Sequence, residues 1–370
     1  MGEREDLVDA AMTLLPPLLD AVDGLRRAGR RLHPPALAEA VAVAAPYRGP
    51  LGEALASFRA QEWPPELKPF RERLLDAAEA ALEGHNALAD CLTDPDQIRD
   101  AYRAVRSVSL ASEALYPLAA SLRPVSRFFL DEEHRDDDAL LDALAAADPS
   151  RPDRGVLHAD NERESRGGFS LYVPETYEPD GRGPAGWPLV IALHGGSGHG
   201  RDFLWMWLPA ARAAGVILAG PTSQGRTWSL AGPDMDSRPL HRMIEQIADG
   251  WRIDRSRILV TGMSDGGSFA LLSGLAPTVP GTHLAPISAS FHPAIVDVAP
   301  PERLRGLPIY LTHGALDWMF PVHIARGAVE ALRAAGADVE YREIADLSHT
   351  YPSEENARIL HWFQGVPLAG

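Results

Sequence analysis

The sequence predicts an α/β fold, in which a mostly parallel sheet is flanked by helices, preceded by an all-helical N-terminal domain. From residue 1 to about residue 147, apolar residues recur at helical spacing and few segments alternate like strands. Beyond residue 155, short apolar runs alternate with helical segments, which is typical of a parallel sheet covered on both faces. We therefore expect two domains, residues 1–150 and residues 155–370.

Apolar stripes predict the N-terminal helices. One stripe consists of Leu7, Ala11, Leu14, Leu18, Val22 and Leu25. We expect Pro16 and Pro17 to kink or divide this helix, because proline lacks the amide hydrogen and clashes with the preceding turn. The charged run 131–138 does not match the spacing of metal ligands and is predicted to be solvated surface. We consider this domain a candidate cap over a site, or an oligomerisation element that forms a homodimer.

Residues 148–155 are rich in proline, aspartate and arginine and are interpreted as the linker. The strands predicted beyond it are Phe169–Val173, Leu189–Leu193, Val216–Ala219, Ile258–Thr261, Ala285–Ser288, Ile309–Thr312 and Val339–Ile344. The predicted helices are Phe203–Ala213, Arg238–Asp249, Ser264–Leu275, Ile324–Ala335 and Ser353–Phe363.

Composition excludes several classes of function. The 370 residues are 45% hydrophobic and 23% charged, as in ordinary globular proteins, and the formal net charge of -16 argues against a nucleic-acid or anionic-membrane partner. Cys91 is the only cysteine, so neither an intrachain disulfide nor a cysteine zinc cluster can form. The acidic start lacks the pattern of a signal peptide and no apolar run reaches membrane-spanning length, so we expect a cytoplasmic location without membrane insertion.

The residues 262–266, Gly-Met-Ser-Asp-Gly, indicate a nucleophile. They follow a strand-like run and precede a helix-compatible run, so Ser264 is predicted to stand on a tight turn between them. Gly262 and Gly266 leave room around the serine, and the following helix N-terminus favours a developing anion. The alternative interpretation is an ordinary glycine-rich turn.

A serine hydroxyl needs a general base, and the base needs a carboxylate to orient it. Asp317 and His349 follow predicted strands in the order serine, acid, histidine, on loops where parallel sheets gather their sites. We predict that they complete a triad with Ser264. Asp346 is the rival acid, and the weaker candidates for the base are His292, His313 and His323.

The residues 194–200, His-Gly-Gly-Ser-Gly-His-Gly, follow another buried strand. The backbone amides of Gly196 and Asp265 are predicted to form the oxyanion hole. A phosphate-binding loop is the competing interpretation, but neither phosphate-loop pattern is present. His194 is expected to orient the loop.

Four motifs occur in the order His-Gly-Gly (194–196), Gly-Met-Ser-Asp-Gly-Gly (262–267), His-Gly-Ala-Leu-Asp (313–317) and His-Thr-Tyr-Pro (349–352). Together they resemble the α/β-hydrolase superfamily, and most of all its phospholipase/carboxylesterase and feruloyl-esterase-like branch. The resemblance covers about residues 168–364 and implies an α/β-hydrolase catalytic domain that is a cofactor-free and metal-free esterase with Ser264, Asp317 and His349 as its triad. Asp265 departs from the glutamine that the small carboxylesterases commonly carry after the serine. The helical first third lies outside the family's minimal domain.

Residues 291–307 leave no room for a substantial lid. The pocket is then either open or covered by the N-terminal helices of the same chain or of a dimer partner, and we expect the second. Trp228 and Trp318 are candidate substrate-binding residues, and Phe203, Trp205 and Trp207 are further aromatics that fit either the site or the core.

We therefore predict a serine carboxylesterase that acts on small-molecule esters, with aryl or bulky acyl esters as candidate substrates. A thioesterase or an acyl-peptide hydrolase would use the same triad. The alternative from another class is a catalytically silent α/β-hydrolase fold that serves as a binding module.

Overall fold

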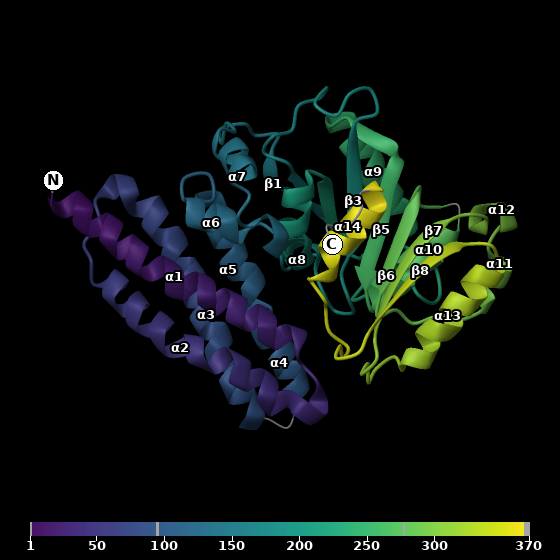
Figure 1. The fold of residues 1–370 in the computed structure, drawn as a ribbon, viewed down its shortest axis with the longest axis horizontal. Coiled ribbons are helices and arrows are strands. Elements are labelled where there is room, and N and C mark those ends of the chain that lie inside the picture. The colour runs from purple at the N-terminus through teal and green to yellow at the C-terminus, as the bar shows by residue number, and fades with distance from the viewer. Residues whose placement is uncertain (1, 94–95, 277, 366–370) are drawn as a thin grey trace. The chain divides into compact units, whose positions relative to one another are not determined.

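The computed structural model describes residues 2–93, 96–276 and 278–365. The chain divides into two compact units, Met1–Ala145 and Ala146–Gly370. Figure 1 shows the first unit in purple to blue and the second in teal to yellow. The assignment of residues 1–150 and 155–370 to domains with separate roles stays a prediction.

The first unit is helical throughout its described residues. Its helices are α1 (Gly2–Arg30), α2 (Leu37–Arg59), α3 (Lys68–Asp90), α4 (Gln97–Val105), α5 (Ser107–Leu115), α6 (Arg123–Phe128) and α7 (Asp138–Ala145). Helix α1 packs against α2 and α3, and α3 also packs against α5. Helix α1 continues through Pro16 and Pro17, so the expectation that they divide it is wrong. Leu14 and Leu18, on either side of them, are fully buried. Such burial stabilises a helix by about 2 kcal/mol per leucine, which offsets part of the loss of about 3 kcal/mol at each proline.

The second unit contains a mostly parallel sheet. Its strands are β1 (Gly155–Ala159), β2 (Phe169–Val173), β3 (Trp187–Leu193), β4 (Ile217–Pro221), β5 (Ile253–Met263), β6 (His283–Ile287), β7 (Pro308–Gly314) and β8 (Asp338–Ile344). Within the described residues their order is β1-β2-β4-β3-β5-β6-β7-β8. Strands β1 and β2 pair antiparallel with each other and β2 with β4, whereas all the other pairs are parallel. Strand β3 is buried at every position, as expected for a central strand covered on both faces.

Helices cover both faces of this sheet. They are α8 (Gly200–Ala214), α9 (Ser237–Gly250), α10 (Asp265–Leu275), α11 (Ala294–Val298), α12 (Pro301–Leu304), α13 (Val322–Ala334) and α14 (Glu355–Gln364). Helices α8 and α14 pack together and lie on one side of the sheet in Figure 1, with α9 and α13 on the other. The predicted fold class is thereby confirmed.

The structure adds elements that the sequence pattern did not predict. Strand β1 begins at Gly155, where the linker was expected to end, and it is a short edge strand that only β2 pairs. Helices α11 and α12 lie in the interval 291–307, which was expected to hold no substantial lid. Both are too short to show a helical period in sequence.

The parallel strands bring the functional loops together. Because β3, β5, β7 and β8 run in the same direction, the segments after their carboxyl ends meet at one edge of the sheet. Among the described residues, no helix is long and apolar enough to cross a membrane.

Candidate active site

Ser264 stands alone between a strand and a helix. Strand β5 ends at Met263 and α10 begins at Asp265, and Ser264 has φ 55° and ψ -118°. Its amide donates to the carbonyl of Ile287 at 2.9 Å, which ties the turn to β6. A Cβ atom on Gly262 would lie 2.6 Å from the backbone of Gly266. The turn can therefore close this tightly only with glycine on both sides of the serine.

His349 connects Ser264 to Asp317. Its Nε2 atom lies 3.0 Å from Ser264 Oγ, and its Nδ1 atom lies 2.8 Å from Asp317 Oδ2. All three side chains are buried. In this geometry Nδ1 donates to the carboxylate, which leaves Nε2 free to accept the serine proton.

The carboxylate of Asp317 is held by its own loop. The amides of Met319 and Phe320 donate to Oδ1 at 2.9 and 2.7 Å. Burial opposes ionisation of Asp317, but the hydrogen bond and charge of His349, together with the Phe320 amide, lower its pKa below the ordinary value. Asp317 therefore stays ionised at neutral pH and can stabilise a positive charge on His349.

A second histidine lies beside the same carboxylate. His313, at the end of β7, is fully buried, and its Nε2 atom lies 2.8 Å from the carbonyl of Phe320 and 3.5 Å from Asp317 Oδ2. Burial lowers the pKa of His313, so the ring is neutral at neutral pH and Nε2 donates to the Phe320 carbonyl. His313 thus braces the loop that carries Asp317.

The rival candidates lie elsewhere. Asp346, His292 and His323 are exposed. His292 accepts a hydrogen bond from the amide of Ala294 at the start of α11. Of the predicted acids and bases, the structure brings Asp317 and His349 to Ser264 and leaves these three outside the buried cluster.

The predicted oxyanion residues face each other across the site. A Cβ atom on Gly196 would lie 2.7 Å from Asp265 Oδ2, so the loop after β3 passes directly over the start of α10. Within the part of the chain that the structure describes, the amides of Gly196 and Asp265 donate to no acceptor. Two free amides beside the serine are suited to a developing oxyanion.

His194 and Arg166 anchor the glycine loop, which consists of residues 194–200 after β3. His194 Nδ1 lies 2.7 Å from the carbonyl of Gly195, and its Nε2 accepts from the amide of Ser223 at 3.1 Å. The guanidinium of Arg166 donates to the carbonyls of Gly198 and Ser223 and to the hydroxyl of Ser223. The expected orienting role of His194 agrees with these contacts. Sequence reasoning missed Arg166, because it lies in an irregular segment with no motif.

The sequence of the second unit has known relatives. Residues 233–365 match the model of the Phospholipase/Carboxylesterase family, Abhydrolase_2. The C-terminal part of this chain is an α/β-hydrolase domain of that family.

Two curated proteins resemble part of this α/β-hydrolase domain. Acyl-protein thioesterase 1 of Gibberella zeae is 27% identical over 127 residues, which are 34% of this chain and 54% of that protein. Carboxylesterase SOBER1 of Arabidopsis thaliana is 27% identical over 128 residues, covering 34% and 55%. The chain thus spans about half the length of the curated relatives it matches. The crystal structure of a thermostable esterase has a TM-score of 0.46 and 22% identity, and it covers 57% of this chain and 62% of that one.

The aromatic residues of the α/β-hydrolase domain differ in exposure. Trp318, next to Asp317, is 42% exposed. Trp228 is buried, stacks on Phe269, and donates from its indole nitrogen to the carbonyl of His194 at 2.7 Å. Trp228 therefore supports the glycine loop through its hydrogen bond to His194. The aromatics of α8, which are Phe203, Trp205 and Trp207, are core residues.

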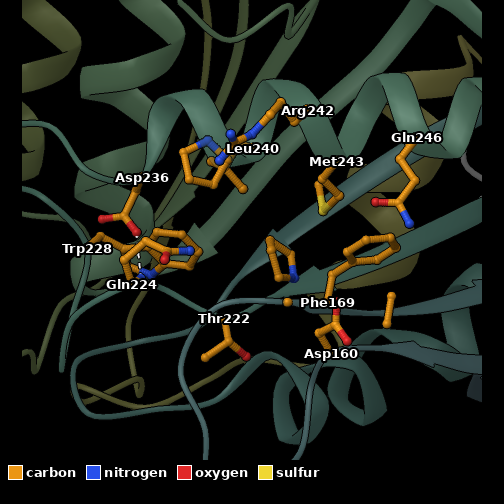
Figure 2. A pocket seen from close by; sticks show the side chains of 14 residues that line it. Asp160, Phe169, Thr222, Gln224, Trp228, Asp236, Leu240, Arg242, Met243 and Gln246 are labelled. Atoms are coloured by element: carbon orange, nitrogen blue, oxygen red, sulfur yellow. Dashed lines mark hydrogen bonds between the residues drawn. The ribbon is translucent and has the colours of Figure 1, made fainter.

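A cavity of about 220 Å³ lies beside Trp228, between the start of β2, the end of β4 and α9 (Figure 2). Phe169, Leu240 and Met243 supply apolar lining, and the exposed Arg242 also lines it. Among the described residues, none of the three triad candidates lines this cavity, and no group of His, Cys, Asp and Glu is arranged to hold a metal ion.

Proposed function

We propose that this chain is a serine carboxylesterase with Ser264 as nucleophile, His349 as general base and Asp317 as the orienting acid. The observation that carries the proposal is the continuous contact from Asp317 Oδ2 through both nitrogens of His349 to Ser264 Oγ. The arrangement is buried, and it lies beside two backbone amides that have no other acceptor among the described residues.

The first step forms an acyl-enzyme. Ser264 Oγ attacks the ester carbonyl carbon while its proton passes to His349 Nε2, and the carbonyl electron pair moves onto the oxygen. The amides of Gly196 and Asp265 donate to that oxyanion. When the intermediate collapses, the alcohol leaves with the proton from His349.

The second step releases the acid. Water replaces the alcohol, gives a proton to His349 Nε2 and attacks the acyl carbon. Collapse returns the proton to Ser264 and frees the carboxylic acid. Asp317 remains ionised in both steps, since its lowered pKa lies far below neutral pH.

An apolar rim favours bulky substrates. The exposed large hydrophobic residues of the second unit are Leu230, Met235, Val298, Leu316, Trp318 and Met319. Of these, Leu316, Trp318 and Met319 directly follow β7 and lie in the loop that carries Asp317. Exposed apolar groups around a site typically contact ligands. We therefore infer that bulky acyl or aryl esters are the substrates.

The deciding experiment is hydrolysis of p-nitrophenyl esters from acetate to palmitate. Replacing Ser264 by alanine should lower kcat by at least about 10³-fold, because the acyl-enzyme forms on its hydroxyl. Ser273→Ala is the matched control, since Ser273 is a buried serine of α10, the helix that follows Ser264, and its hydroxyl donates to the Phe269 carbonyl. A folded wild type that neither hydrolyses any ester nor reacts with a fluorophosphonate probe would favour the binding module.

Substitution of Asp317 and of Asp346, which lie on neighbouring loops, tests which aspartate orients His349. Asp317→Asn should lower kcat by about 10³- to 10⁴-fold, because an amide favours the wrong tautomer of His349. Asp346→Asn should change kcat less than threefold. The reverse result would assign the acid to Asp346.

A thioesterase is the second candidate, favoured by the match to Acyl-protein thioesterase 1. The same triad would serve thioesters and, as an acyl-peptide hydrolase, amides. Competition between matched ester, thioester and anilide substrates separates the three activities by their relative kcat/KM.

A further inference from the structure

Asp265 carries a carboxylate at the edge of the proposed oxyanion hole. It follows Ser264 directly and is the first residue of α10. Its Oδ2 atom would lie 2.7 Å from a Cβ atom on Gly196 and accepts a hydrogen bond from Thr227 Oγ1 at 2.5 Å. The side chain is partly exposed. A substrate that is bound to Ser264 and Gly196 therefore lies within a few ångströms of this carboxylate.

Asp265 has no charged hydrogen-bond partner among the described residues. Its hydrogen-bond donor Thr227 is neutral, and no ion pair in the described parts of the chain includes Asp265. Asp265 lies at the amino end of α10, where the helix dipole favours a negative charge. Arg226 precedes Thr227, but its side chain is exposed and makes no ion pair with Asp265.

We propose that Asp265 makes the site selective for the charge of the ester, so that cationic esters are preferred to neutral ones and anionic esters are rejected. This inference rests on the proposed esterase function. The interaction between two unit charges about 7 Å apart, at an effective dielectric constant of about 35, changes a binding constant by about tenfold. We therefore expect kcat/KM to rise about tenfold for a cationic ester and to fall by a similar factor for an anionic one.

A purely structural role would leave no such signature. If Asp265 did no more than brace Thr227 and the loop before α9, its loss would lower the activity on all esters equally. The ratio of kcat/KM between a charged ester and its neutral isostere cancels that common loss. The ratio thus reports charge selection alone.

The experiment compares two matched pairs of esters at low salt. The first pair is acetylcholine and 3,3-dimethylbutyl acetate, which differ by a quaternary nitrogen in place of carbon. The second pair is the p-nitrophenyl monoester of adipic acid and its methyl ester. In the full-length wild type we expect a cationic-to-neutral ratio near ten in the first pair and an anionic-to-neutral ratio near one tenth in the second.

Asp265→Asn keeps the shape of the side chain and removes its charge, so both ratios should move to about one. Thr227→Val is the matched control, because it removes the hydrogen bond but keeps the charge, and both ratios should stay as in the wild type. Raising the salt concentration should weaken the wild-type preference.

Wild-type ratios near one in both pairs at low salt would overturn the proposal without any variant. Ratios that are equal in the wild type and in Asp265→Asn would overturn it as well. Hydrolysis of the neutral members by the wild type, lost in Ser264→Ala, tests the proposed function separately. Charge selection can therefore fail while the esterase activity stands.

Discussion

Ser264 has a backbone conformation that residues other than glycine rarely adopt. With φ 55° it lies in a region that costs about 1–3 kcal/mol, and the surrounding structure has to hold it there. The amide of Ser264 donates to Ile287, and its carbonyl accepts from the amide of Ser268. This strain raises the hydroxyl out of the turn toward His349, where a relaxed turn would point it elsewhere.

Buried histidines make stability depend on pH at the level of single residues. Burial lowers the pKa values of His85, His199, His283 and His313. Such a group binds a proton more readily in the unfolded chain than in the folded one. Its stabilising contribution is complete above the unfolded pKa of about 6.5 and is lost as the pH falls toward the folded value.

We therefore predict that the free energy of unfolding falls as the pH is lowered from 7.5 to 5.5. Replacing His313 by asparagine should reduce this slope by up to about 1.4 kcal/mol per pH unit. Urea unfolding followed by tryptophan fluorescence reports on the second unit, because Trp63 is the only tryptophan in the first. A slope that His313→Asn leaves unchanged would contradict the prediction.

At the scale of elements, the glycine loop after β3 depends on contacts from two other segments. Arg166 contacts the loop from the segment before β2. Ser223 and Trp228 contact it from the segment between β4 and α9. A glycine-rich loop has little stiffness of its own, so these contacts determine where its amides point.

Arg166→Gln should lower kcat about tenfold with little change in KM, because a displaced oxyanion donor weakens the transition state more than the ground state. The matched control is Arg163→Gln, since Arg163 lies in the same segment but pairs with Asp202 of α8. Steady-state kinetics on one ester suffices. Equal losses in both variants would mean that the segment as a whole, rather than Arg166, supports the loop.

Sequence patterns predict the bounds of some strands and miss those of others. Strand β2 was predicted with its observed bounds, because an apolar run flanked by glycine and proline has no competing interpretation. Strand β5 begins at Ile253, five residues before its predicted start, because Asp254–Ser256 break the apolar run. Pairing of Trp187 in β3 with Ile253 extends the strand there.

At the scale of the whole molecule, the chain has no long insertion between β6 and β7. Only α11 and α12 occupy that interval, and both are short. An element that covers the site would have to come from another part of the protein. We keep the prediction that the helices of the first unit supply it, from the same chain or from a dimer partner.

Deleting residues 1–150 tests this prediction and leaves β1 intact, since β1 begins at Gly155. We expect a folded protein whose ratio of kcat/KM for p-nitrophenyl butyrate and laurate differs from that of the full chain by about fivefold or more, because the acyl chain loses apolar contacts. Circular dichroism checks the fold. An unchanged ratio in a folded truncated protein would show that the helices do not cover the site.

The sequence by itself determined the fold class, the two-part organisation and the candidates Ser264, Asp317 and His349, because hydrophobic period and motif order are local properties of a chain. It left Asp346 and three other histidines as rivals to these. The tertiary structure decided which of them meet, because hydrogen-bond distances depend on strand order and on loops far apart in sequence. It also decided that Arg166 braces the loop after β3 and that His313 braces the loop of Asp317, since only packing brings such scattered residues together.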